Sequence, residues 1–183
     1  ESVDLSKRPF LVKSADGRTV NAESIILATG ATAKRMAIPG ANEGEYWQRG
    51  VSACAVCDGA LPIFRDQPLV VVGGGDSAME EASFLSKFAS RVFIVHRRDD
   101  LRASRIMQQR AIGNPKIEFL YSHAVKEVRG DGQLMRECVV TDLKTDVDRT
   151  IPAAGLFFAI GHEPNTRFLN NQLKTDSQGY IVT

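Results

Sequence analysis

Two cysteines and a carboxylate stand close together in the stretch Cys54-Ala55-Val56-Cys57-Asp58-Gly59. Cysteines three positions apart can close a small disulfide ring, and a neighbouring thiol can lower the pKa of the attacking thiol from its free value of about 8.5. The carboxyl of Asp58, directly after Cys57, can supply or take up the proton that disulfide reduction requires. These residue types at this spacing indicate thiol–disulfide exchange, with Cys54, Cys57 and Asp58 as candidate catalytic residues.

The same cysteine spacing also serves as half of a zinc site, which is the alternative. A structural zinc ion takes about four ligands, usually including a second pair of cysteines or histidines farther along the chain. Cys138 is the one remaining cysteine, and the three histidines, His96, His123 and His162, are scattered without ligand-like spacing. The pattern therefore favours redox chemistry, and we expect no metal site. For Cys138 we expect a packed, inert thiol.

The composition is that of a globular protein with room for one large or two small domains. The chain has 183 residues, a net charge of +1 and 43% hydrophobic residues. It lacks the basic excess of a general nucleic-acid binder, and its apolar runs are too short to span a bilayer. Three cysteines do not make a secreted disulfide framework and fit a reducing compartment. We therefore expect no nucleic-acid or membrane partner and a cytoplasmic location, with an organelle as the alternative.

A glycine-rich turn follows a short apolar run. Residues 68–72 are β-rich and unbroken, as in a buried parallel strand, and they lead into Gly73-Gly74-Gly75-Asp76-Ser77-Ala78. Apolar residues at positions 78, 82, 85 and 89 then predict an amphipathic helix. Gly73 permits a tight turn, Gly75 lets a pyrophosphate approach the backbone, and Ala78 allows close helix packing. The order of these elements predicts a dinucleotide site; a βα turn that binds nothing is the alternative.

Basic residues follow the next predicted strand, residues 91–95. An NAD site usually has Asp or Glu about 20 residues after the glycines, where it binds the ribose 2′-hydroxyl. Here the chain carries His96-Arg97-Arg98, with Arg102 one helical turn on. Arginine donates paired hydrogen bonds to phosphate and stays charged, so these residues indicate the 2′-phosphate of NADPH. A solvated basic turn is the alternative.

The rest of the chain mixes helix and strand. The remaining predicted elements are a helix over residues 103–111 and strands over 25–30, 117–121, 124–128, 134–141 and 156–160. We expect the strands from 117 to 141 to form an antiparallel insertion that caps the open sheet. The strands at 25–30 and 156–160 both stop at glycine, and we expect domain boundaries near Pro39-Gly40 and Pro164-Asn165. The fold class is therefore α/β, a doubly wound Rossmann-like domain with an antiparallel β insertion.

Several motifs together resemble those of low-molecular-weight thioredoxin reductases, and the resemblance runs the whole length of the chain. The motifs are ATGA (28–31), GVSACAVCDG (50–59), GGGDSAMEEA (73–82), HRRD (96–99) and AIGHEPN (159–165). Within that family, the motifs look more like those of the plant, algal and fungal enzymes than like the bacterial ones.

The resemblance implies electron transfer from NADPH to FAD, from FAD to the Cys54–Cys57 disulfide, and from the dithiol to thioredoxin. In this family pattern Cys57 lies nearer the flavin and Asp58 handles the proton; which cysteine attacks thioredoxin stays open. The residues implied to bind NADPH are Gly73, Gly75, Asp76, Ser77, Ala78, Glu80, His96, Arg97, Arg98, Arg102, Ile160 and Gly161. The residues implied to contact FAD are Thr29, Gly30, Ala31 and Cys57. The full-length protein is expected to be a homodimer.

The chain also departs from the family, because a complete reductase begins with a glycine-rich FAD turn and ends with a Gly-Asp segment, and neither is present. We therefore expect a fragment that binds NADPH without full turnover. Residues 1–39 would be the first part of the FAD-binding domain, residues 40–164 the NADPH-binding domain with the redox disulfide, and residues 165–183 the start of a second FAD segment. The alternatives are the flavoprotein component of an alkyl hydroperoxide reductase and a non-catalytic NADPH-binding domain.

Overall fold

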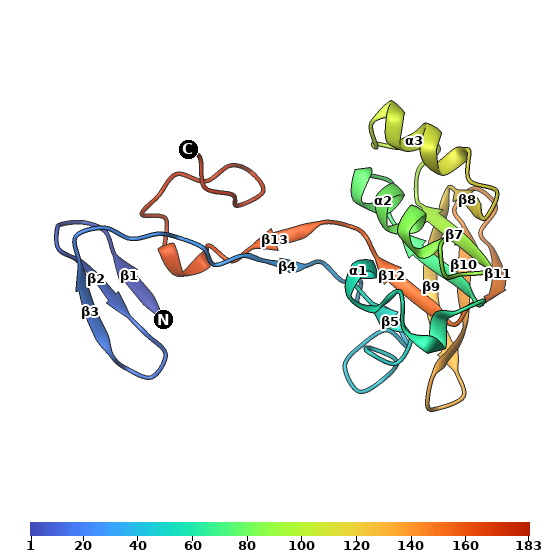
Figure 1. Cartoon of the computed structure of the whole chain (residues 1–183), viewed down its shortest axis with the longest axis horizontal. Helices are drawn as coiled ribbons and strands as arrows, with labels where there is room; N and C mark the ends of the chain where they lie inside the picture. The colour runs from blue at the N-terminus through green and yellow to red at the C-terminus, as the bar shows by residue number, and fades with distance from the viewer. The chain divides into compact units, whose positions relative to one another are not determined.

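The computed structural model describes all 183 residues, and their contacts divide the chain into two units. The larger unit is continuous, Lys34–Gly161, and the smaller one combines Glu1–Ala33 with His162–Thr183. The chain therefore enters the larger unit after Ala33 and leaves it after Gly161 (Figure 1). The assignment of residues 1–39, 40–164 and 165–183 to flavin and nucleotide segments stays a prediction.

A five-stranded parallel sheet forms the centre of the larger unit. Its strand order is β5-β12-β6-β7-β8, and every neighbouring pair is parallel. The strands are β5 (Val51–Ser52), β6 (Pro68–Val72), β7 (Arg91–His96), β8 (Ile117–Tyr121) and β12 (Gly155–Phe158). The apolar runs at 68–72 and 91–95 are thus confirmed as neighbouring strands. Their apolar residues follow one another without interruption because a parallel sheet is buried on both faces.

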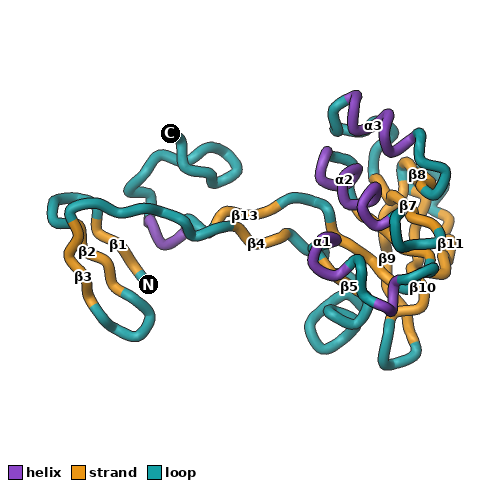
Figure 2. The backbone as a smooth tube through the Cα atoms, viewed as in Figure 1, coloured by secondary structure: helices purple, strands orange, loops and turns teal.

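Helices cover one face of this sheet (Figure 2). They are α1 (Ala55–Asp58), the short 3-10 turn η1 (Pro62–Phe64), α2 (Asp76–Leu85) and α3 (Arg105–Ile112). Leu69, Val71 and Ile94 of the sheet pack against Met79 and Leu85 of α2. The predicted helix after the glycine turn is confirmed, with the apolar positions 78, 82 and 85 fully buried.

A three-stranded antiparallel sheet covers the opposite face of the parallel sheet. It has the order β11-β10-β9, formed by β9 (His123–Gly130), β10 (Met135–Asp142) and β11 (Val147–Pro152). Val70, Val72 and Val95 of the parallel sheet pack against Val125 and Val140 of this second sheet. The predicted α/β class with an antiparallel insertion is confirmed. Its helices lie on one face of the parallel sheet, and the insertion takes the place of helices on the other.

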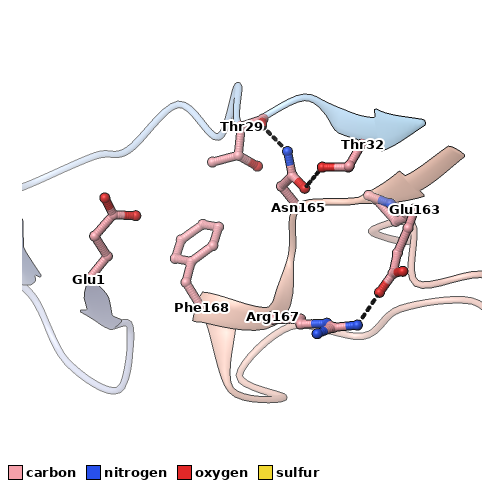
Figure 3. Close-up of a pocket in the computed structure, with 8 residues that line it drawn as sticks. Glu1, Thr29, Thr32, Glu163, Asn165, Arg167 and Phe168 are labelled. Carbon is pink, nitrogen blue, oxygen red and sulfur yellow. Dashed lines mark hydrogen bonds and ion pairs between the residues drawn. The ribbon is translucent and has the colours of Figure 1, made fainter. Parts of the chain in front are cut away.

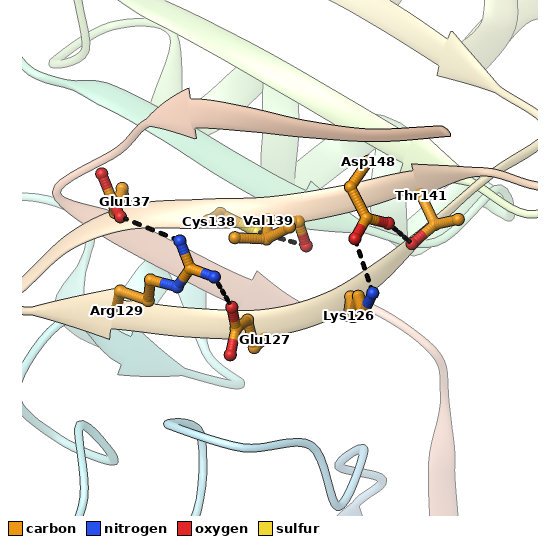
Figure 4. A network of polar contacts seen from close by, with 8 residues as sticks. All are labelled: Lys126, Glu127, Arg129, Glu137, Cys138, Val139, Thr141 and Asp148. Carbon is orange, nitrogen blue, oxygen red and sulfur yellow. Dashed lines mark hydrogen bonds and ion pairs between the residues drawn. The ribbon is translucent and has the colours of Figure 1, made fainter. Parts of the chain in front are cut away.

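The antiparallel sheet also accounts for the third cysteine. Cys138 of β10 is fully buried, and burial raises the pKa of its thiol to about 12 because the thiolate would lose its hydration. A thiol that stays protonated is a poor nucleophile, so Cys138 is inert, as expected. The same sheet carries exposed polar contacts (Figure 4), such as the Lys126–Asp148 ion pair at 2.5 Å. Exposed pairs of this kind add little to stability.

Two expectations from the sequence need correction, and one further strand was not predicted. The strand at 117–121 is not part of the antiparallel insertion: β8 pairs with β7 in parallel, as an edge of the central sheet. The third strand of the insertion, β11, was not predicted, because its residues are mostly exposed and polar and lack an apolar run. The predicted strand over 25–30 is wrong. No strand pairs with this segment and Ile26 is 93% exposed, so an apolar sequence without a pairing partner forms no ladder.

The smaller unit is built from short antiparallel strands. A three-stranded sheet contains β1 (Ser2–Asp4), β2 (Phe10–Lys13) and β3 (Thr19–Ala22). A two-stranded ribbon joins β4 (Ala31–Ala33) to β13 (His162–Pro164), followed by the 3-10 turn η2 (Arg167–Leu169). The ribbon therefore pairs the segment that leads to the larger unit with the segment that returns from it.

The packing of α2 on the sheet gives a prediction about stability. Leu85 is fully buried at the end of α2, so Leu85→Ala should lower the free energy of unfolding by about 2–5 kcal/mol, the usual cost of an aliphatic core truncation. Urea unfolding followed by circular dichroism measures this. Ile106→Ala on α3 is the control, because Ile106 is 56% exposed. Equal effects of the two substitutions would contradict the assigned packing.

Candidate active site

Cys54 and Cys57 form a disulfide, with their Cα atoms 5.3 Å apart. Cys54 is the N-cap of α1, and its sulfur accepts a hydrogen bond from the backbone N–H of Cys57 at 3.2 Å. Cys57 is exposed, whereas Cys54 is half-buried, so a reacting molecule has better access to Cys57. No group of three or more His, Cys, Asp or Glu side chains is arranged to hold a metal ion. The pair is therefore built as a disulfide.

A buried hydroxyl links Asp58 to the cysteine segment. The Oγ of Ser52 donates a hydrogen bond to Oδ2 of Asp58 at 2.6 Å and accepts one from the backbone N–H of Cys54 at 3.1 Å. Ser52 is 3% exposed because it ends β5 within the sheet. It therefore holds the Asp58 carboxyl beside the first turn of α1. The sequence predicts no role for Ser52, whose one signal is its place two residues before Cys54.

A second carboxyl near the cysteine segment, that of Glu81 on α2, also has no predicted role. Helix α2 packs against α1, and the backbone N–H of Ala55, the residue after Cys54, lies near the Glu81 carboxyl. The Oε2 atom of Glu81 is buried and has no hydrogen-bond partner. Burial raises the pKa of Glu81 to about 7, with the nearby Ala55 N–H opposing the shift and the charge of Glu80 adding to it.

A cavity of 430 Å³ lies at the carboxyl ends of β6, β7 and β12. The strand order reverses between β6 and β12, and ligands of open parallel sheets bind at such reversals. Among the residues expected to bind NADPH, those that line the cavity are Gly73, Gly75, Ser77, His96, Arg97, Arg98, Arg102, Ile160 and Gly161. The lining also includes Met36, His123, Ala124 and Val125, which no motif predicts, because segments distant in sequence bring them there.

Close contacts explain the glycines of the turn. A Cβ on Gly73 would overlap the backbone of Ala159, and a Cβ on Gly74 would overlap the His96 ring. A Cβ on Gly75 would meet no atom within 4 Å, so a ligand has room to approach the backbone there. Gly75 is also the N-cap of α2, whose first backbone N–H groups have no partner within the helix and suit an anion.

Three arginines give the cavity its charge. Arg97, Arg98 and Arg102 are exposed, and none of them forms an ion pair with a carboxylate. His96 differs: it is 7% exposed, and its Nε2 lies 3.0 Å from the carbonyl oxygen of Asp100. The arginines are therefore free to bind an anion. His96 instead packs between the glycine turn and residues 97–102, the arginine loop.

Three other residues expected to bind NADPH lie outside the cavity lining. The Oδ1 atom of Asp76 accepts a hydrogen bond from the backbone N–H of Ser104 at 2.6 Å, which ties the glycine turn to the start of α3. Ala78 is fully buried under the turn, and Glu80 is exposed on α2. Asp76 and Ala78 thus shape the turn, and a direct contact of Glu80 with a nucleotide stays a prediction.

The smaller unit has its own cavity of 580 Å³, lined in part by Thr29, Thr32, Asn165 and Phe168 (Figure 3). Asn165 connects the lining: its Nδ2 donates to the carbonyl oxygen of Thr29 at 3.0 Å, and its Oδ1 accepts from Thr32 at 2.9 Å. Its backbone N–H donates to the carbonyl oxygen of Gly30 at 3.0 Å. Among the residues expected to contact FAD, Thr29 lines this cavity, whereas Gly30 and Ala31 follow in the backbone beside it.

Comparison with known proteins places these features in a family. All residues 1–183 match the family model described as pyridine nucleotide-disulphide oxidoreductase. Thioredoxin reductase 2 of Arabidopsis thaliana is 56% identical over 99% of this chain and 48% of its own length. The thioredoxin reductase of Chlamydia trachomatis is 53% identical over all of this chain and 58% of its own length. The crystal structure of Lactococcus lactis thioredoxin reductase matches with a TM-score of 0.87 and 40% identity, over 100% of this chain and 58% of the other.

These comparisons bear on two expectations. The similarity to thioredoxin reductases over the whole chain is confirmed, and it extends to a bacterial enzyme as well as to a plant one. The chain spans about half the length of the curated relatives it matches.

The two hydrogen bonds of the Ser52 hydroxyl predict that its removal lowers the stability of the protein. Ser52→Ala removes a buried hydroxyl and leaves the Asp58 carboxyl and the Cys54 N–H without their partner. The free energy of unfolding should fall by about 1–3 kcal/mol, the cost of unpaired buried polar groups. Urea unfolding measures it, with Ser177→Ala, at an exposed serine, as the control. A loss no larger than that of the control would show that the hydrogen bonds carry no weight.

Glu81 predicts a pH dependence of stability. Its pKa is about 7 in the folded chain, above the ordinary glutamate value of 4.5, so the folded state binds the proton more tightly than the unfolded state. The contribution of Glu81 to stability is then largest below pH 4.5 and is lost as pH rises from 4.5 to about 7. Glu81→Gln removes this dependence and should therefore be more stable than the wild type above pH 7, with no such gain below pH 4.5. Thermal unfolding across this range tests the sign.

Proposed function

The chain belongs to the pyridine nucleotide-disulphide oxidoreductase family, and we propose that the whole protein is an NADPH-dependent thioredoxin-disulfide reductase that uses FAD. One observation carries the proposal: the unit Lys34–Gly161 holds both a disulfide with one exposed cysteine and a cavity lined by three arginines without ion-pair partners. The similarity to proteins named thioredoxin reductase supports thioredoxin as the substrate.

The residues that line the cavity of the larger unit fit NADPH. Gly75 leaves open space beside the backbone, and the start of α2 offers N–H groups suited to a pyrophosphate. Arg97, Arg98 and Arg102 would bind the 2′-phosphate, because arginine pairs with phosphate in a bidentate manner and has no competing carboxylate here. Ile160 and Gly161 would border the nucleotide at the end of β12. NADPH, when bound, supplies a hydride.

The flavin would be held in part by the smaller unit. Thr29 and Asn165 present polar groups to its cavity, and the positive φ of Gly30, 67°, sets the turn between them. Cys57, the exposed cysteine of the pair, would lie nearer the flavin. FAD, when bound, passes electrons from the nucleotide to the disulfide.

The cysteine segment would carry out the exchange with thioredoxin. Reduction of the disulfide adds two electrons and gives one thiol and one thiolate after uptake of one proton. A thiolate of the reduced pair attacks the thioredoxin disulfide, and the other cysteine resolves the mixed disulfide, so that the pair is reoxidised. Asp58, held by Ser52, would move protons to and from the departing sulfur.

Organisation and location complete the proposal. Residues 1–39 and 165–183 would belong to the FAD-binding part, and residues 40–164 to the NADPH-binding part. The family resemblance supports a homodimer and a cytoplasmic or organellar compartment. The structure has no helix long and apolar enough to cross a membrane.

The arginine loop gives the test of the proposal. In the FAD-loaded whole protein, the double substitution Arg97→Ala, Arg98→Ala should lower kcat/KM for NADPH in thioredoxin reduction by about tenfold or more, as lost charge-assisted hydrogen bonds require. The value for NADH, which lacks the 2′-phosphate, should change little. Arg105→Ala, at an exposed arginine of α3 outside the cavity lining, is the matched control.

Two outcomes would contradict the proposal. Equal losses with NADPH and NADH would show that the arginines do not recognise the 2′-phosphate. NADPH oxidation without reduction of thioredoxin by the unsubstituted protein would remove thioredoxin as the substrate.

A further inference from the structure

The Glu81 carboxyl is a buried ionisable group that the proposed reaction does not use. One of its oxygens, Oε2, is buried without a hydrogen-bond partner. Native proteins rarely leave such an atom unpaired, because a charged carboxyl without full hydrogen bonding is costly to bury. A methionine or leucine would pack between α1 and α2 without this cost, so packing alone does not explain a carboxyl here.

The position of Glu81 relates it to the disulfide. Helix α2, which carries Glu81, packs against α1, and the backbone N–H of Ala55, the first residue of α1, lies near enough to the Glu81 carboxyl to lower its pKa. Ala55 directly follows Cys54, and the same short helix contains Cys57. Charge that develops on either sulfur is therefore created one helical turn or less from the peptide that lies near Glu81.

We propose that Glu81 takes up one proton when the Cys54–Cys57 disulfide is reduced and releases it when the pair is reoxidised. The inference rests on the proposed function, because it assumes that this pair cycles between disulfide and dithiol. Glu81 acts on the pair through its charge, so it is a positioning residue and not a catalytic residue.

The step balances in electrons, protons and charge. A hydride equivalent, two electrons with one proton, converts the S–S bond into one thiol and one thiolate. The new thiolate raises the proton affinity of a nearby carboxylate, because two like charges in a poorly hydrated place repel each other. Glu81 then binds one proton from solvent, and the local negative charge stays as it was. Oxidation of the pair by a substrate disulfide reverses both changes.

The surroundings of Glu81 leave the carboxyl without a strong partner charge. Its pKa is raised to about 7 by burial, so its protonation can change in the neutral range. Glu80 on its own helix is the neighbouring charge that adds to this shift. The ionisable groups on the elements packed against α2 are Asp58, Cys54 and Cys57 on or beside α1, Arg105 and Arg110 on α3, and Arg91 and His96 on β7.

The test is the redox equilibrium of the pair as a function of pH. The whole protein is incubated with reduced and oxidised dithiothreitol at a fixed ratio until the state of the pair no longer changes, and the thiols are trapped with an alkylating reagent. The reduced-to-oxidised ratio of Cys54–Cys57 is then measured. The ratio for Glu81→Gln is divided by that of the wild type at each pH, so the pH dependence of dithiothreitol cancels. Neutral Gln imitates the protonated carboxyl at every pH.

The expected result is a difference that depends on pH. Well above pH 7 the wild-type carboxylate opposes formation of the thiolate, so Glu81→Gln should be more reduced than the wild type by about threefold or more. Near pH 6 the wild-type carboxyl is already mostly protonated, and the two proteins should agree. A purely structural effect of the substitution would change the ratio equally at both pH values.

Controls separate this inference from the proposed function. Glu118→Gln, at a partly exposed carboxyl paired with Arg91, should match the wild type throughout. If Glu81→Gln does not fold, Glu81→Met removes the charge with a similar volume and takes its place in the same measurement. A pH-independent ratio overturns the role of Glu81 and leaves the reductase proposal intact. A Cys54–Cys57 pair that stays oxidised in excess dithiothreitol overturns both.

Discussion

Parallel pairing of β6 with β7 on one side and β12 on the other is the constraint on which the rest of the larger unit depends. In this register Val72 lies beside Val95 and Phe158, so the three strands end at one level. The chain that follows each strand must then emerge at the same edge, which brings the glycine turn, the arginine loop and the segment Ala159–Gly161 around one cavity. Burial of apolar residues on both faces holds this arrangement.

The same helix serves the nucleotide cavity and the cysteine pair. The N-terminus of α2 borders the cavity, while its later turns pack against α1. That packing is close: a Cβ on Gly59, directly after α1, would overlap Leu85. Glu81 lies on this helix between the two regions. A change in α2 therefore affects both the arginine-lined cavity and the segment that carries the disulfide.

Local sequence patterns predict the site well where a few adjacent residues carry its chemistry. The run at 68–72, Gly75 and Arg97 are examples, because strand period, open backbone and fixed charge are properties of short segments. Contacts between distant segments are not visible in this way. Ser52 and Glu81 acquire their roles only when β5, α1 and α2 come together. The segment at 25–30 fails for the opposite reason, since an apolar run becomes a strand only beside a partner.

The central claim is that electrons from a nucleotide bound at the arginine-lined cavity reach the Cys54–Cys57 disulfide. Anaerobic titration of the FAD-loaded whole protein with NADPH, followed by counting of free thiols, tests it most directly. The account predicts two new thiols per chain in the wild type and none in Cys57→Ser, whose disulfide cannot form. Consumption of NADPH without any gain in thiols in the wild type would contradict it.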